Sequence, residues 1–456
     1  MKKLSYLLLA CLVISTAACK KNDPALPDNQ LAFSASAQGL ASTDNSVDVV
    51  LNLGRATDVA IPVSVDLTGS GVTYGTEFTT APAAVNNTLN LTIPAGSSSV
   101  SFKVTKVDGV FLSGSESVNF VIKSAGQPVV LGSTSTLKLS FSSIVSTGSA
   151  LTLDGGEGGS AAVNSVYVDL SNNFQSSVKR NSWDLGFYNG DDFRVILNNT
   201  TAASVVAVNK TDINTVSAAD VTLANLELGF GKGTFAIFDD VTGDLTKTAI
   251  AQVSATEASN LTYVINRAGG AGTTAAAADL IKIRVLRATN GYILQYAKLN
   301  ETTFKTLTVT KNTAANFNYI NFDTGAAVTV EPAKDRWDLV WTYSIYFTGT
   351  TPYAFSDLVF GNYLGNTQIA EVLTSTVTYD AYAEANLATT TFTPSRNTIG
   401  SGWRATTGTV GVKTDRFYVV KDGAGNVYKL KFVSFTTQDG GTRGYPKIEY
   451  TLVKKA

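Results

Sequence analysis

From about residue 31 to residue 141, apolar and polar residues alternate in short runs. Each run has the length of a β-strand and a period of two, and clusters of Gly, Ser, Asn or Asp separate one run from the next. Five of these runs are SVDVVLNL, VAIPVSVDL, TLNLTIPA, VSFKVTKV and SVNFVIKS. No long helical period interrupts them. The pattern therefore predicts a β-sandwich over residues 31–143.

The chain changes character after this region. Of the 18 tyrosines, 16 lie beyond residue 150, and so do all 4 tryptophans. Such a shift indicates a domain boundary, which we place near Ser143–Gly148. Alternating runs continue beyond it, and the pairs Asn290-Gly291 and Asp422-Gly423 predict hairpin turns. The segments ADVTLANL and YDAYAEANL are short enough to form helices of one or two turns.

Beyond the boundary the sequence repeats itself, in the same order but with different loop lengths. Tyr167 precedes the Trp183-Asp-Leu motif in the way that Tyr319 precedes Trp337-Asp-Leu. Two further matching pairs follow, VSAADVTLANL with VTYDAYAEANL and KIRVLRATNGYILQYAKL with RFYVVKDGAGNVYKLKFVSF. Conserved order with variable loops is typical of tandem copies of one module.

We therefore predict an all-β chain with minor short helices. The sandwich is followed by two tandem, mostly antiparallel β modules, at residues 149–310 and 311–456. Trp183 and Trp337 each lie in a strand among apolar neighbours. A large aromatic side chain in that setting normally anchors a sheet, so both are expected in the core.

The first residues have the layout of an export signal. Two lysines after Met1 precede the apolar stretch Leu4–Ala18, which is shorter than the roughly 20 residues that span a bilayer. Small residues followed by Cys19 look like a bacterial lipoprotein signal. That resemblance implies a signal peptide at residues 1–18, acylation of Cys19 and a polar tether at 19–30, with the protein held at a membrane surface. The alternative is an ordinary cleaved signal with an incidental cysteine.

The composition removes much of the usual chemistry. The chain has no histidine, its only methionine is Met1, and Cys11 and Cys19 both lie in the leader. After export, zinc sites built on imidazole and thiolate, iron–sulfur clusters, disulfides and catalysis by Ser-His-Asp or Cys-His are excluded. Basic and acidic residues number 35 and 36 without any basic run, which excludes a nucleic-acid footprint. The acidic run from Asp239 to Asp244 favours a solvated hairpin tip over a calcium loop. Nothing indicates an enzyme.

The N-terminal sandwich resembles the Calx-beta domain. The resemblance rests on the order GVTYGTEFTT, LTIPAGSSSVSFKVTKVDG and GSESVNFVIKSA. Members of that family often bind calcium through carboxylates at one end of the sandwich, and the matching candidates here are Glu77, Asp108 and Glu116. Calcium takes six to eight oxygen ligands, whereas this region offers few. A spacer or adhesion module is therefore the favoured interpretation.

The remainder of the chain, roughly residues 160–456, resembles the HmuY family of Bacteroidetes lipoproteins, which are all-β haem-binding proteins. The resemblance rests on the segments RNSWDLGFYN, DDFRVILNN and the closing hairpin RFYVVKDGAGNVYKLKFVSFTTQDGGTRGYPKIEYTLV. It implies a non-enzymatic lipoprotein associated with the outer membrane, on its cell-surface or periplasmic face. Such a protein binds haem or a related tetrapyrrole such as protoporphyrin and passes it to a TonB-dependent receptor.

This sequence departs from the family in the residues that hold iron. Family members that carry haem use paired His or Met side chains, and the exported chain has neither. Tyrosinate is the remaining ligand, with Tyr188, Tyr343 and Tyr346 as candidates. On alternating strands, such tyrosines also serve as half-buried packing residues. The porphyrin itself would be held by apolar and aromatic walls and by Lys or Arg contacts to its propionates.

A second functional hypothesis comes from the aromatic residues alone. The surroundings of Trp341 and Trp403, VWTYSIYF and GSGWRATT, are compatible with an apolar or sugar-facing cleft. The protein would then be a surface adhesion or glycan-binding lipoprotein whose partner is a glycan rather than a small hydrophobic ligand. Either hypothesis leaves the chain without a catalytic role.

Overall fold

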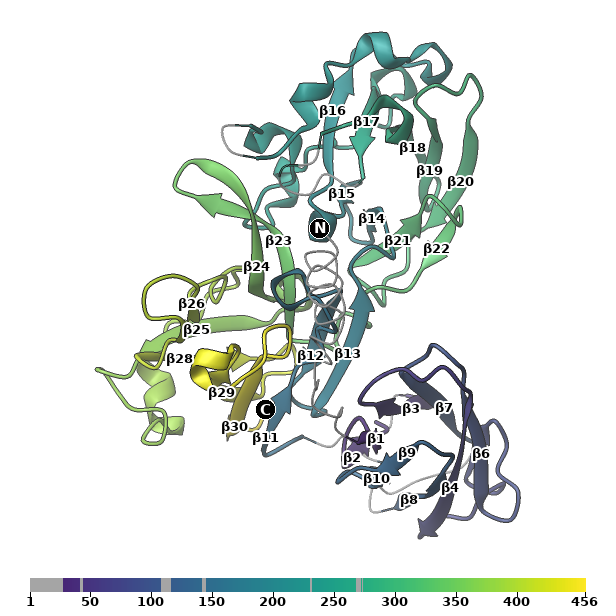
Figure 1. Ribbon diagram of the computed structural model, residues 1–456, viewed down its shortest axis with the longest axis vertical. Helices are drawn as coiled ribbons and strands as arrows, with labels where there is room; N and C mark the ends of the chain where they lie inside the picture. The colour runs from purple at the N-terminus through teal and green to yellow at the C-terminus, as the bar shows by residue number, and fades with distance from the viewer. Residues whose placement is uncertain are drawn as a thin grey trace, which may run out of the picture. The chain divides into compact units, whose positions relative to one another are not determined.

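The computed structural model describes residues 28–41, 44–107, 116–141, 145–229, 232–267, 272 and 274–456. These residues fall into two compact units. One contains nearly all described residues up to Phe141, and the other contains all those from Val145 onward. Both units consist mainly of strands (Figure 1), so the predicted all-β fold class is confirmed. Within the described ranges, no helix is long and apolar enough to cross a membrane.

The described strands up to Ser140 form a sandwich of two five-stranded sheets. In one sheet the order is β5 (Phe78–Ala81), β7 (Ser99–Lys106), β3 (Ser46–Leu53), β1 (Asn29–Phe33) and β9 (Val129–Leu131). In the other it is β2 (Ala37–Gly39), β10 (Thr136–Ser140), β8 (Ser117–Ala125), β4 (Ile61–Ser70) and β6 (Thr88–Ile93).

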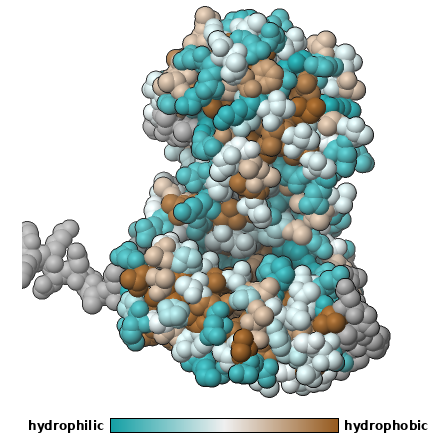
Figure 2. All heavy atoms as spheres, turned by 90° about the vertical axis from the view of Figure 1, so that its right-hand side faces the viewer, coloured by the Kyte–Doolittle hydropathy of each residue, from teal (hydrophilic) through white to brown (hydrophobic). Residues whose placement is uncertain are grey.

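Period-two alternation explains the core between these sheets. In β3, Val49, Leu51 and Leu53 are buried while the side chains between them are not. Successive side chains of a strand point to opposite faces, so each sheet contributes one apolar face to the core. On the face of the molecule shown in Figure 2, the remaining hydrophobic residues are scattered in small groups among hydrophilic ones.

The described residues of the second unit form four larger sheets and one two-stranded sheet. Two of the sheets have five strands: one has the order β11 (Gly148–Thr152), β30 (Lys447–Lys454), β29 (Val427–Ser434), β28 (Arg416–Lys421) and β25 (Gln368–Leu373), and the other has the order β16 (Ser204–Val208), β17 (Thr262–Asn266), β18 (Ile281–Ala288), β19 (Gly291–Lys298) and β20 (Lys305–Thr310). Two sheets have four strands: one has the order β13 (Phe174–Lys179), β12 (Asn164–Asp169), β23 (Leu339–Thr348) and β24 (Thr351–Gly361), and the other has the order β15 (Val195–Leu197), β14 (Leu185–Tyr188), β21 (Phe317–Asn321) and β22 (Ala326–Val328). The two-stranded sheet pairs β26 (Arg404–Ala405) with β27 (Gly411–Val412).

Helical structure in the described chain is limited to short 3₁₀ segments, and the two predicted helices are among them. The segments are η1 (Gly159–Ala161), η2 (Asn199–Thr201), η3 (Ile213–Thr215), η4 (Ala218–Asp220), η5 (Leu223–Leu226), η6 (Phe235–Ile237), η7 (Leu245–Lys247), η8 (Glu257–Ser259), η9 (Ala277–Asp279), η10 (Tyr363–Gly365), η11 (Glu384–Thr389) and η12 (Thr437–Asp439).

The two ranges predicted as tandem modules share three of these sheets. Strand β12 pairs with β23, β14 pairs with β21, and β11 pairs with β30, so that each pair joins one strand from 149–310 to one from 311–456. Figure 1 shows β12 beside β23 in this arrangement. The two ranges therefore form one interlocked unit, because neither range can complete its sheets alone.

The sequence repeat reappears as matched contacts across this interlock. The ring of Tyr319 packs edge-on against Trp183, with centroids 4.8 Å apart, and Tyr167 packs in the same way against Trp337 at 5.0 Å. Each tryptophan is 8 % exposed. The repeated tryptophan of one half is thus covered by the repeated tyrosine of the other half. Both pairs have the edge-to-face geometry that aromatic rings favour.

The hydrogen bonds around each tryptophan are matched as well. Asn198 Nδ2 donates to the carbonyl oxygens of Arg180 and Trp183, at 2.8 and 2.7 Å. Asn362 Nδ2 donates to those of Lys334 and Trp337, at 2.7 and 2.9 Å. Both asparagines are buried. The two copies of the repeat therefore form two equivalent parts of one fold. We call them the matched corners, and each consists of a buried tryptophan, the tyrosine that packs on it and the asparagine that hydrogen-bonds to its carbonyl oxygen.

Candidate functional site

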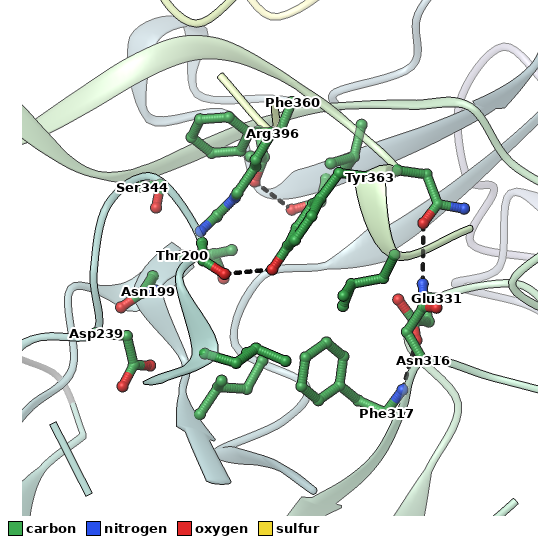
Figure 3. A pocket seen from close by; sticks show the side chains of 18 of the residues that line it. Asn199, Thr200, Asp239, Asn316, Phe317, Glu331, Ser344, Phe360, Tyr363 and Arg396 are labelled. Atoms are coloured by element: carbon green, nitrogen blue, oxygen red, sulfur yellow. Dashed lines mark hydrogen bonds between the residues drawn. The ribbon is translucent and has the colours of Figure 1, made fainter. Parts of the chain in front are cut away.

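A cavity of about 130 Å³ lies inside the second unit, and residues from both interlocked halves line it. An engineered apolar cavity of about 150 Å³ in another protein holds a benzene molecule, so this one has room for about one ring. Figure 3 shows Phe317, Phe360 and Tyr363 around it. The remaining apolar and aromatic lining includes Trp183, Ile196, Leu197, Tyr319, Trp337, Val340 and Leu364.

Arg396 is the cation of this cavity. Its Cζ atom lies 4.1 Å from the centroid of the Phe360 ring, which holds the guanidinium against the wall of the cavity. Its carbonyl oxygen accepts from Gly361 N at 2.7 Å, which fixes the backbone. Burial lowers the pKa of Arg396, and the nearby Tyr363 and Asp239 oppose that shift. Figure 3 marks no hydrogen bond from the guanidinium to the residues drawn, and in the described part of the chain its electrostatic neighbours include Tyr363 and Asp239, so its N–H donors can bind a ligand.

Two buried carboxyls face the same cavity. Asp239 accepts hydrogen bonds from Leu197 N at 2.7 Å and from Ala249 N at 3.0 Å. Glu331 accepts from Phe317 N at 2.8 Å. Burial raises the pKa of Asp239 to about 6 and that of Glu331 to about 7. Backbone N–H groups therefore hold both carboxyls in place, and Arg396 acts on Asp239 only electrostatically.

The turn after Asp239 closes one side of the cavity. The Tyr363 hydroxyl donates to the carbonyl oxygen of Gly243, and burial raises the pKa of Tyr363 to about 12. Gly243 has a φ of 86°, and a Cβ there would lie 2.9 Å from Arg396 Cδ and 3.0 Å from Tyr363 Oη. Only glycine allows this close approach. The prediction of a solvated tip was wrong for Asp239, which is 6 % exposed, because the turn folds inward against β15.

The structure places the tyrosine candidates outside this cavity. Tyr188 is half-buried beside Phe317, with ring centroids 5.6 Å apart. Tyr346 is buried and stacks on Phe347 at 4.3 Å. Burial raises the pKa values of Tyr188 and Tyr343, and carboxylates near Tyr188 add to its shift. The surroundings of Tyr188 and Tyr343 favour the neutral phenol, so they oppose a tyrosinate ligand for iron at these two residues.

The tryptophan candidates lie in the core. Trp341 and Trp403 are each 1 % exposed. Trp403 stacks on Phe432 with centroids 4.1 Å apart and donates through Nε1 to the carbonyl oxygen of Asp357 at 3.0 Å. The Arg180 guanidinium lies over Trp341, 5.2 Å from the ring centroid. Neither indole offers an open face to a sugar.

Of the three carboxylates considered for calcium, the structure describes Glu77 and Glu116. Glu77 accepts from Thr73 N at 2.6 Å, and Glu116 is half-buried. Asp108 lies outside the described residues, as does Cys19. Among the residues that the structure describes, no three His, Cys, Asp or Glu side chains are grouped so that they could hold a metal ion.

Several solved structures resemble parts of the chain at low identity. The apo form of the Calx CBD1 domain is 13% identical, covering 25% of this chain and 97% of that one, with a TM-score of 0.22. The periplasmic chaperone SfaE is 8% identical, covering 37% and 93%, with a TM-score of 0.19. A putative carbohydrate binding protein from Bacteroides ovatus is 12% identical, covering 73% and 81%, with a TM-score of 0.17. TM-scores this low do not establish a shared fold.

Sequence comparison gives a clearer result for the second unit. No curated protein matches the chain. The family model of the HmuY protein matches residues 162–450, which is more than half of the chain and includes both interlocked halves in one continuous match. The chain therefore belongs to the HmuY family.

Proposed function

We propose that this protein binds haem or protoporphyrin without an axial ligand to the iron, and that it has no catalytic role. The observation that carries the proposal is the Arg396 guanidinium on the wall of an aromatic cavity, in a chain of the HmuY family. The usual axial ligands do not fit this chain, since histidine is absent and the only methionine is Met1. The protein must then bind the ligand through contacts with the porphyrin ring and its propionate carboxylates.

The size of the cavity sets how such a ligand enters. At about 130 Å³ it accepts one pyrrole ring with its propionate, not a whole tetrapyrrole. The propionate pairs with Arg396, and charge-assisted hydrogen bonds of this kind are worth about 1.5–3 kcal/mol. Phe317, Phe360 and the buried tryptophans supply the apolar contact for the ring. Iron adds nothing to this recognition.

The rest of the proposal concerns location. Export through residues 1–18 and acylation of Cys19 would anchor the protein at the outer membrane, and the first unit would act as a Calx-beta-like spacer. A TonB-dependent receptor would then take the ligand onward. The lipoprotein pattern at Cys19 supports the anchor, and the sandwich of two five-stranded sheets supports the spacer.

A matched pair of arginine variants tests the binding site. In Arg396→Met the cation is lost while the apolar stem remains. Arg287→Met is the control, because Arg287 also lies over an aromatic ring, Phe193 at 4.2 Å, but is not part of the cavity. Residues 20–456 of each variant are titrated with protoporphyrin IX and followed by porphyrin absorption and tryptophan quenching.

We expect saturable binding to the wild type and to Arg287→Met, and binding at least about tenfold weaker to Arg396→Met, the ratio that corresponds to 1.4 kcal/mol. Thermal unfolding of each variant checks that the fold is intact. Absence of saturable binding to the wild type would refute tetrapyrrole capture. Equal binding by both variants would refute the role of Arg396.

A further inference from the structure

Three arginines converge on a bulge in β24. Arg443 donates through Nε and Nη2 to Asp357 Oδ2, at 2.9 and 2.5 Å, and through Nη2 to Ser356 Oγ at 3.0 Å. Arg404 donates through Nη2 to the carbonyl oxygen of Ser356. Asp357 also acts electrostatically on Arg180 and Arg404. We call Arg180, Arg404, Arg443 and Asp357 the arginine cluster.

The backbone at Asp357 is shaped to present this carboxylate. Pairing between β23 and β24 shifts register between Thr342 and Ser344, which leaves Ser356 and Asp357 in a bulge. Asp357 has a φ of 55°, a left-handed conformation that is uncommon for a residue other than glycine. Bulges of this kind re-aim side chains and are frequent at binding sites.

Several polar atoms of the cluster have no partner. Arg180 and Arg404 are each 7 % exposed, and the Asp357 side chain is 1 % exposed. Within the described chain, Nε and Nη2 of Arg180, Nε of Arg404 and Oδ1 of Asp357 are buried and make no hydrogen bond. The site therefore offers several free donors and one free acceptor.

The charges of the cluster do not balance. One carboxylate accepts hydrogen bonds from Arg443 and acts electrostatically on Arg180 and Arg404, and arginine stays protonated at neutral pH. A buried charge without a partner is costly, whereas a well-oriented partner repays that cost. Aromatic rings hold two of the guanidiniums in place: Trp341 and Tyr343 lie 5.2 and 5.8 Å from Arg180, and Phe435 lies 5.4 Å from Arg443.

We propose that the arginine cluster binds a hydrogen phosphate group. The guanidinium forks match the oxygens of an oxyanion, and the free Oδ1 of Asp357 accepts the proton that hydrogen phosphate carries. Sulfate at neutral pH has no such proton. A sulfate oxygen and Oδ1 of Asp357 would both be acceptors, so they would repel each other. The Arg443 side chain is 30 % exposed, so solvent reaches the cluster at this residue. This site is independent of the cavity that contains Arg396.

The experiment compares anions on the exported chain at pH 7 and constant ionic strength. Calorimetric titration and thermal unfolding are measured with sodium phosphate, sodium sulfate and sodium chloride. We expect saturable binding of about one phosphate per chain with a raised Tm, and binding of sulfate at least about tenfold weaker. Phenyl phosphate, which has one ester oxygen, tests whether the source is a phosphomonoester or free phosphate.

Two variants connect the binding to the cluster. Arg180→Met should weaken phosphate binding at least about tenfold, whereas Arg287→Met should leave it unchanged. Asp357→Asn, which retains the shape but loses the carboxylate, should remove the preference for phosphate over sulfate. Phosphate that raises Tm no more than chloride, equal binding of sulfate by the wild type, or unchanged binding by Arg180→Met would each overturn the proposal.

Discussion

Replacing Asn198 by alanine removes the side chain that closes one of the two matched corners of the second unit. Asn198 is 1 % exposed. Its Nδ2 atom is the donor to Trp183 O, whereas Arg180 O also accepts from Thr200 Oγ1 at 2.9 Å. One buried carbonyl is therefore orphaned, at a cost of about 1–3 kcal/mol in the free energy of unfolding.

Asn362→Ala is the matched change in the other corner. It removes the donor to Trp337 O, while Lys334 O lies on an exposed residue where water can replace the lost bond. The expected cost is again about 1–3 kcal/mol. Because the two halves share sheets, each variant should lower the midpoint of one and the same unfolding transition.

Urea unfolding followed by tryptophan fluorescence measures this directly. All 4 tryptophans lie in the second unit, so the signal reports on that unit. We expect a single transition in the wild type and in both variants, shifted to lower urea in each variant. Two separate transitions, with each variant moving only one of them, would refute the interlocked unit.

Two further predictions concern the cavity. The raised pKa values of Asp239, about 6, and Glu331, about 7, mean that the folded state binds these protons more tightly than the unfolded state. Their contribution to stability is therefore lost as pH rises from about 4 to about 7, so the urea midpoint of the wild type should fall across that pH range. Asp239→Asn should make the midpoint depend less on pH. A wild-type midpoint that rises with pH across the range would contradict the prediction. Gly243→Ala places a Cβ against Arg396 and Tyr363 in a left-handed backbone and should cost about 1–2 kcal/mol of stability, with weaker protoporphyrin binding; wild-type values would show that the turn does not shape the cavity.

The alternation of apolar and polar residues predicted the strands, because a few consecutive residues are enough to show it. The run SVDVVLNL is β3, and the repeated Trp183 and Trp337 are buried as expected. Pairing between β12 and β23 joins residues more than 150 positions apart, and periodicity carries no information about which strand lies beside which. The repeat was therefore visible in the sequence, but its interlocked form was not.

The binding residues were harder to predict for a related reason. Arg396 stands in the segment TPSRNT, where nothing distinguishes it from a surface arginine, and only the fold brings it over Phe360. Asp239 looked solvated because it belongs to an acidic run with Asp240 and Asp244, yet its partners are Leu197 N and Ala249 N. Trp341 and Tyr343 were proposed for different ligands, and only the fold shows that both rings lie beside the guanidinium of Arg180.

The ratio of the dissociation constants of haemin and protoporphyrin IX, measured for residues 20–456 under one set of conditions, tests the central claim most directly. Recognition through Arg396 and the apolar walls of the cavity predicts a ratio close to one. A much tighter complex with haemin, with an iron-dependent absorption band that disappears in Tyr188→Phe, would show that a tyrosinate holds the iron and would contradict the account.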